Sequence, residues 1–263
     1  MNARTVRAAA AAAALVVSGG IAGTSFAGNA SEAPPAAAAK TSGKIAIVQA
    51  VPKVDLTVTV DGDAVQQAVA EGTVVGPLDL PAGSHEITFS DASGGTDDIT
   101  STVDVTAGQS SDVVVHRPAE VGGSPVVSVY LTPSDPIEAG KARVLLAHTA
   151  TTAPADVVVD GQTVFTNIAN GEFAQADVAA GAHEVSLLPA GVTGKPILGP
   201  LDVDLAPGTI TAVYAVGNPK DGSMNVIVRT TGGTASAEQP PSQIDTGSAG
   251  LVSGVPVWTF STR

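Results

Sequence analysis

The second half of the chain repeats the first half at an offset of about 99 residues. Three signals keep their order in both copies: a basic residue before an aliphatic run, a Val-Asp-Gly tripeptide, and an Ala-Gly turn before His-Glu. They begin at Lys44, Val60 and Ala82 in the first copy and at Arg143, Val159 and Ala180 in the second. Internal repetition predicts two copies of one folding module. We place them at 44–130 and 141–230, joined by a linker over 131–140 that contains Pro133 and Pro136.

Within each copy, apolar residues recur at every second position, as in Leu56, Val58 and Val60. This alternation is typical of a strand that buries one face. Asp-Gly at 61–62 and again at 160–161 predicts a hairpin turn, because glycine accepts the positive φ that such turns need. Short strands separated by frequent turn signals predict an all-β fold. We expect two tandem antiparallel β-sandwich domains, immunoglobulin- or transthyretin-like, each of about seven strands.

The composition limits how these modules are stabilised and what they bind. There is no cysteine, so disulfides and thiolate chemistry are excluded and the fold depends on core packing. With five Phe, two Tyr and one Trp, the cores are expected to be aliphatic. The formal net charge of −13 argues against binding nucleic acid or anionic lipid, because both need Lys and Arg to displace counterions.

The first 27 residues resemble an export signal. Arg4 and Arg7 precede an apolar stretch that ends at Ser25-Phe26-Ala27, so cleavage is predicted after Ala27. Ser18 and the glycines after it interrupt the apolar stretch, which therefore falls short of a membrane span. Residues 28–43 are expected to be an Ala/Pro spacer. We predict a secreted or cell-wall-associated protein with no membrane span in the mature chain.

The second copy resembles the secreted domain-of-unknown-function family 4397, found in cell-envelope proteins of high-GC Gram-positive bacteria. The resemblance rests on the following residues: Gly140-Lys141-Ala142-Arg143-Val144, His148, Ala153 to Gly161, Ala180-Gly181 and Thr211 to Gly217. The first copy resembles a diverged member, because Gln49 stands where His148 does. The resemblance implies modules of uncharacterised role.

Catalytic and metal-binding patterns are not recognisable in the sequence. His85-Glu86 and His183-Glu184 lie on predicted strands, where neighbouring side chains point to opposite faces and cannot share a ligand. His148 is kept as a candidate functional residue, against the structural interpretation of a histidine bonded to a loop backbone. Calcium at the clustered aspartates is the weaker alternative to turn formation. We predict no enzyme, no cofactor and no metal site.

Residues 231–263 are predicted to form a flexible tail, for which there are two interpretations. Ile244-Asp245-Thr246-Gly247 resembles the Thr-Gly peptides cut by sortase transpeptidases, but the following apolar stretch is too short to anchor in a membrane. Alternatively, Val255 to Phe260 is a strand that pairs with an open sheet edge. The favoured function is a structural, adhesive or partner-binding module pair acting on a cell-wall or surface protein. The alternative is a small-ligand or glycan binder, and the sequence does not determine the oligomeric state.

Overall fold

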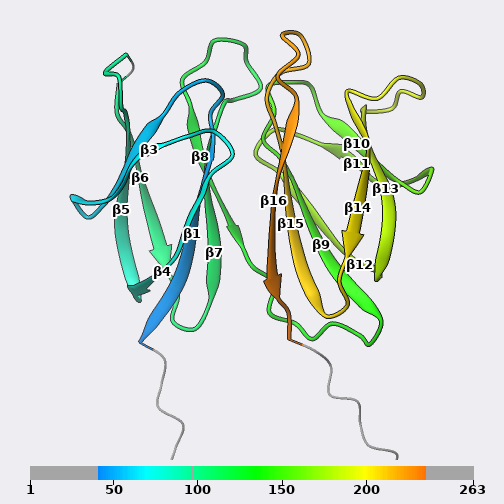
Figure 1. The fold of residues 1–263 in the computed structure, drawn as a ribbon, viewed down its shortest axis with the longest axis horizontal. Helices are drawn as coiled ribbons and strands as arrows, with labels where there is room; N and C mark the ends of the chain where they lie inside the picture. The colour runs from blue at the N-terminus through cyan, green and yellow to red at the C-terminus, as the bar shows by residue number, and fades with distance from the viewer. Residues whose placement is uncertain (1–40, 96, 235–263) are drawn as a thin grey trace, which may run out of the picture. The chain divides into compact units, whose positions relative to one another are not determined.

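The computed structural model describes residues 41–95 and 97–234, and these form sixteen β-strands (Figure 1). The first module contains β1 (Ser42–Ala50), β2 (Leu56–Val60), β3 (Asp63–Val69), β4 (Val74–Pro81), β5 (Gly83–Asp91), β6 (Ile99–Val105), β7 (Ser110–His116) and β8 (Val126–Leu131). The second contains β9 (Lys141–His148), β10 (Ala155–Val159), β11 (Gln162–Ile168), β12 (Phe173–Ala179), β13 (Gly181–Pro189), β14 (Leu198–Leu205), β15 (Thr209–Val216) and β16 (Asn225–Gly232). In this part of the chain no helix is long and apolar enough to cross a membrane.

Each module is a sandwich of two four-stranded sheets. In the first module the strand orders are β4-β1-β7-β8 and β3-β2-β5-β6. In the second they are β12-β9-β15-β16 and β11-β10-β13-β14, which is the same arrangement with equivalent strands. The predicted all-β fold of two tandem β-sandwiches is therefore confirmed.

The sheets differ from the expected antiparallel pattern at one place in each module. β1 pairs with β7 in parallel, and β9 pairs with β15 in parallel, while the other pairs are antiparallel. Each module also has eight strands where about seven were expected. Alternation of apolar residues reports which face of a strand is buried but contains no information on the neighbour or its direction. In the first module β5 and β6 lie in the other sheet, so the chain returns to the sheet of β1 when it forms β7, and β7 then runs in the same direction as β1.

The Asp-Gly pairs make the predicted hairpin turns between β2 and β3 and between β10 and β11. Asp61 and Gly62 have φ values of 51° and 86°, and Asp160 and Gly161 have 50° and 78°. Positive φ at both central residues defines the turn whose twist matches the flanking strands. Asp tolerates this left-handed conformation better than most residues, and Gly adopts it without strain.

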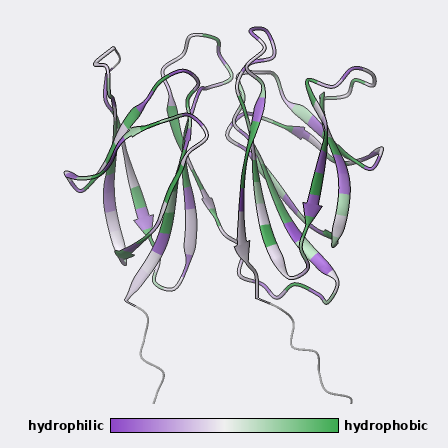
Figure 2. Cartoon of the chain, viewed as in Figure 1, coloured by the Kyte–Doolittle hydropathy of each residue, from purple (hydrophilic) through white to green (hydrophobic). Residues whose placement is uncertain are grey.

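The core of the first module lies between its two sheets and consists of aliphatic side chains around Phe89. Ile47, Val58, Ile87, Phe89 and Val113 are all 0% exposed. Hydrophobic and hydrophilic residues alternate along the strands in Figure 2. Leu56, Val58 and Val60 point inward as the sequence predicts, with half-buried threonines between them.

Another apolar cluster joins the two sandwiches. It contains Val48 and Val114 from the first module and Tyr214 and Val216 from the second, all 0% exposed. Consequently β1 and β7 are buried on both faces, as are β9 and β15. The sequence shows this as continuous apolar runs, a pattern typical of strands covered on both sides.

Polar groups are also buried in the contact between the sandwiches. The Tyr214 hydroxyl donates a hydrogen bond of 2.5 Å to Oδ2 of Asp112, and Arg229 Nη1 lies 2.8 Å from Oδ1 of the same carboxylate. The Tyr130 hydroxyl donates to the Gly171 carbonyl at 3.1 Å. Burial raises the pKa of the Asp112 carboxyl, although Tyr214 and Arg229 act in the opposite direction.

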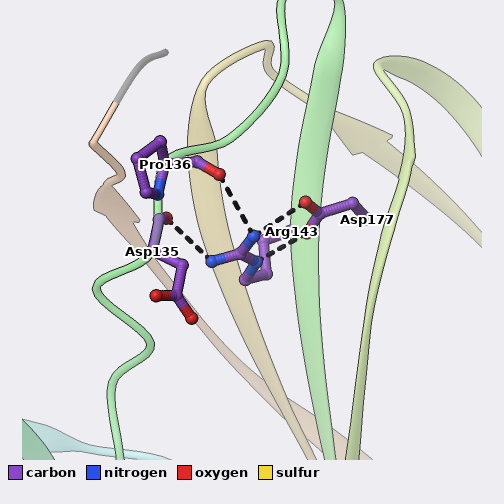
Figure 3. Close-up of polar contacts among 4 residues, drawn as sticks. All are labelled: Asp135, Pro136, Arg143 and Asp177. Atoms are coloured by element: carbon purple, nitrogen blue, oxygen red, sulfur yellow. Dashed lines mark hydrogen bonds and ion pairs between the residues drawn. The ribbon is translucent and has the colours of Figure 1, made fainter.

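The linker is held against the second module by Arg143, as Figure 3 shows. Its guanidinium donates to both carboxylate oxygens of Asp177, at 2.5 and 2.7 Å, and to the backbone carbonyl of Asp135 at 2.9 Å. Ile137, 1% exposed, donates its N–H to the Thr234 carbonyl. β16 runs to Gly232, beyond the predicted module limit at residue 230, so the last described residues belong to the sandwich and not to the tail.

Candidate functional site

A histidine and an aspartate form the same contact in both modules. Nδ1 of His85 lies 2.7 Å from Asp61 Oδ2, and its Nε2 lies 2.9 Å from the Pro81 carbonyl oxygen. In the second module, His183 Nδ1 lies 2.7 Å from Asp160 Oδ2, and its Nε2 lies 2.8 Å from the Ala179 carbonyl. Both partners are acceptors, so the ring satisfies both only when each nitrogen has a proton.

The electrostatics of these pairs agree with a protonated ring. The hydrogen bond from His85 lowers the pKa of the Asp61 carboxyl, and the Asp61 carboxylate raises the pKa of His85. Asp160 raises the pKa of His183 in the same way. The second carboxylate oxygen of each aspartate accepts the backbone N–H that follows the histidine. Each pair therefore fixes the Asp-Gly turn to the neighbouring strand, and Glu86 lies exposed on the opposite face from His85.

His148 lies at the end of β9 and is 0% exposed. Its Nε2 lies 3.2 Å from the carbonyl oxygen of Ala153, in the loop that follows, and its Nδ1 has no hydrogen-bond partner among the described residues. Gln49, at the equivalent position, donates to the carbonyls of Val51 and Val54. Both side chains hold the loop after the first strand of their module.

His116, at the end of β7, is also 0% exposed. Its ring nitrogens lie 2.9 Å from the Arg117 carbonyl and 2.9 Å from Ser128 Oγ. Burial lowers the pKa of His116, and the nearby His148 lowers it further. Burial also lowers the pKa of His148. Both rings are therefore neutral near pH 7.

The remaining candidates from the sequence are not brought together into a site. Ile244, Asp245, Thr246 and Gly247 lie outside the described residues, as does the stretch 255–260. Within 41–95 and 97–234, no group of three or more His, Asp or Glu side chains is arranged to hold a metal ion.

An apolar cavity of about 390 Å³ lies inside the second sandwich, between its two sheets. We call it the β9–β16 cleft. Its lining comes from every strand of the module and is aliphatic, apart from Phe165, His183, Asp202 and Asp204. The inward-facing Val228 of β16 is 49% exposed, so the cleft opens to solvent beside this edge strand. The volume lies within the range of about 300–1,000 Å³ that is usual for small-molecule sites.

At four inward-facing strand positions the second module has a smaller residue than the first, although Phe165 and Leu201 are larger than their equivalents Gln66 and Ser101. The pairing registers of β1 with β4 and of β9 with β12 align the two modules, as do those of β2 with β5 and of β10 with β13. The substitutions, first module to second, are Ile45 to Val144, Leu78 to Ala176, Ile87 to Val185 and Phe89 to Leu187. All four of the smaller residues line the cleft. The repeat contains this signal, but sequence reasoning missed it because it compared motifs and not side-chain volumes.

The cleft is in contact with solvent at its opening beside Val228, so apolar lining side chains are left partly unburied. The cleft can bind apolar groups, since burying them removes apolar surface from water on both sides.

A sequence model of the family described as Domain of unknown function (DUF4397) matches residues 43–155. The match covers the first module, the linker and the beginning of the second module. Our expectation placed the clearer resemblance in the second copy, whereas only one copy is detected and it begins in the first. No curated protein matches the chain. The chain therefore contains a domain of unknown function within an all-β protein.

Proposed function

We propose that this protein is an exported, non-catalytic module pair that binds a cell-wall or surface protein partner. The observation that supports this most is the buried contact between the sandwiches. Apolar side chains and the contacts of Asp112 with Tyr214 and Arg229 cross this contact. A pair held in this way presents loops and edge strands in fixed positions, which suits a structural or adhesive role.

The contacts of the histidines support a non-catalytic role. His85 and His183 each hold a turn through an aspartate, and His116 and His148 are fully buried against backbone carbonyls. A catalytic base needs access to a substrate proton. In these positions the four rings act on the protein's own backbone.

Export is proposed on the sequence alone, from the basic and apolar start that ends at Ala27. The second module is proposed to be a second domain of the same family, because its strand order repeats that of the first. Processing by a sortase at Thr246 is the alternative for the tail.

A small-ligand function is the second candidate, and the β9–β16 cleft favours it. A glycan is a poor fit for this cleft, because sugar hydroxyls need polar partners and sugar faces need exposed aromatic rings. Phe165 is the one aromatic residue in the lining.

Binding of the purified full chain to cell-wall fractions, purified envelope proteins and a glycan array tests the proposal. We expect saturable binding to a wall or protein component with no chemical turnover. Hydrolytic or redox turnover that is abolished by His148→Ala or His183→Ala, in variants that remain folded, would contradict the non-catalytic assignment.

A further inference from the structure

We propose that the β9–β16 cleft is a binding site for a linear aliphatic chain with an uncharged or cationic head group. This rests on the small-ligand candidate above and names the ligand class of its cleft, and it does not depend on the surface partner or on export.

The lining offers almost no hydrogen-bonding capacity to a ligand. Both ring nitrogens of His183 already contact Asp160 and the Ala179 carbonyl. The other inward-facing side chains are Val, Leu, Ala and Phe. A buried polar ligand group would lose its bonds to water without replacement, which is unfavourable. The occupant must therefore be apolar along the part that enters.

The comparison with the first module indicates that the space is specific to the second. Ile87 is 0% exposed, whereas its equivalent Val185 is partly exposed and lines the cleft, and Leu187, the smaller equivalent of Phe89, lines the cleft although it is 2% exposed. Likewise Val103 is 1% exposed while Val203 is partly exposed. The same sheet arrangement with smaller side chains leaves a slot one side-chain layer deep, since packed sheets lie about 10 Å apart. A linear chain fits such a slot.

The rim of the cleft is acidic. Asp202 and Asp204 alternate along the edge strand β14 with the inward-facing Leu201 and Val203, so their exposed carboxylates point to the outer face of the sheet, and they act on a bound head group through space at the edge of the cleft. Asp202 also pairs with Glu184 on β13. Carboxylates at the rim repel an anionic head group and favour a cationic or neutral one, most strongly at low ionic strength. The charge complementarity therefore distinguishes an alkyl cation from a fatty-acid anion.

Calorimetric titration of the full chain with alkyltrimethylammonium ions and alkyl sulfates of 8–14 carbons, below their micelle concentrations, tests the proposal. The Kd for the ammonium series should fall about fourfold per methylene until the cleft is filled. Sulfates of equal length should bind at least about tenfold more weakly, given two nearby carboxylates. No saturable binding, no dependence on chain length, or equal affinity for the two head groups would overturn the proposal.

Two variants fill the cleft with the residues of the first module, Leu187→Phe and Ala176→Leu. Each should weaken binding of the ammonium probe about tenfold or more, because the inserted carbons occupy the ligand's space. Val192→Phe is the matched control, since Val192 is 53% exposed and outside the lining. Unchanged affinity in both filling variants refutes the site.

Val228→Lys provides a test that does not depend on core packing, because Val228 is already half exposed. A cation at the opening should weaken binding of the ammonium probe and strengthen binding of the sulfate, so the head-group preference narrows or reverses. A preference that stays the same would place the bound chain elsewhere and overturn the proposal.

Discussion

Replacing Asp112 with Ala tests the buried contact between the sandwiches. Asp112 is 3% exposed and accepts the hydrogen bond of Tyr214, which is 0% exposed. It is also the counterion of Arg229, whose side chain is 14% exposed. The second module has Ala212 at the equivalent position of β15, so the strand itself accepts alanine there.

The expected loss comes mainly from the groups left behind. Removing one member of a buried ion pair costs about 3–5 kcal/mol, because the remaining charge is buried without a partner. The unpaired Tyr214 hydroxyl is part of the same loss and is not added separately. For a protein of this size, 1 kcal/mol shifts Tm by roughly 2–4 °C, so Asp112→Ala should lower Tm by about 6–20 °C.

Calorimetric thermal unfolding at pH 7 measures this loss. Asp112→Asn keeps an acceptor for Tyr214 and should give an intermediate value, and combining Asp112→Ala with Arg229→Ala should cost less than the sum of the single changes. Asp104→Ala, an exposed carboxylate on β6, is the control and should change stability by less than about 0.5 kcal/mol. If Asp112→Ala lowers Tm no more than Asp104→Ala does, the contact contributes nothing and the reasoning is wrong.

Four further predictions concern other regions of the chain. Burial lowers the pKa of His148, so its neutral side chain contributes stability above the unfolded pKa of about 6.5, and this stability is lost as pH falls through the folded pKa. His148→Gln, which copies the residue of the first module, should therefore reduce the loss of stability between pH 7.5 and 5. Thermal melts of the variant and the unchanged protein at both pH values measure the difference. Gly217→Ala should lower the free energy of unfolding in urea by more than about 2 kcal/mol, because Gly217 has a φ of 90° and a Cβ there would overlap the Ser223 carbonyl. Gly232→Ala is the control, because a Cβ at Gly232 would meet open space. A fragment spanning 135–234, which keeps all of β16 and the linker residues bonded to the second module, should show β-sheet circular dichroism, and a disordered spectrum would mean that the modules do not fold separately. Amino-terminal sequencing of the secreted protein should give a chain that begins at Gly28. Mass spectrometry should find an intact carboxyl terminus, whereas a product that ends at Thr246 and is linked to a wall fragment would establish sortase processing.

The histidine–aspartate pairs were only half foreseen from the sequence. The Asp-Gly turns and the placement of His85 on the inner face of its strand follow from local patterns. The bond between His85 and Asp61 spans 24 residues and depends on β2 pairing with β5, which no local pattern specifies. The structural interpretation of His148 predicted a bond to a loop backbone, and the structure gives the Ala153 carbonyl as the partner, but the effect of His148 on the pKa of His116 required the tertiary structure.

The sequence by itself determined the repeat, the all-β class, the turn positions and the faces of the strands, because these depend on residues close together in the chain. Only the tertiary structure decided that β1 pairs in parallel with β7, that Asp112 contacts Tyr214 and Arg229, and that the second sandwich contains a cleft. Each of these depends on which distant strands meet and on the volumes of side chains that face one another across a gap. The apolar alternation of a strand selects its buried face, whereas the volumes of the side chains that face it decide how the space between the sheets is filled.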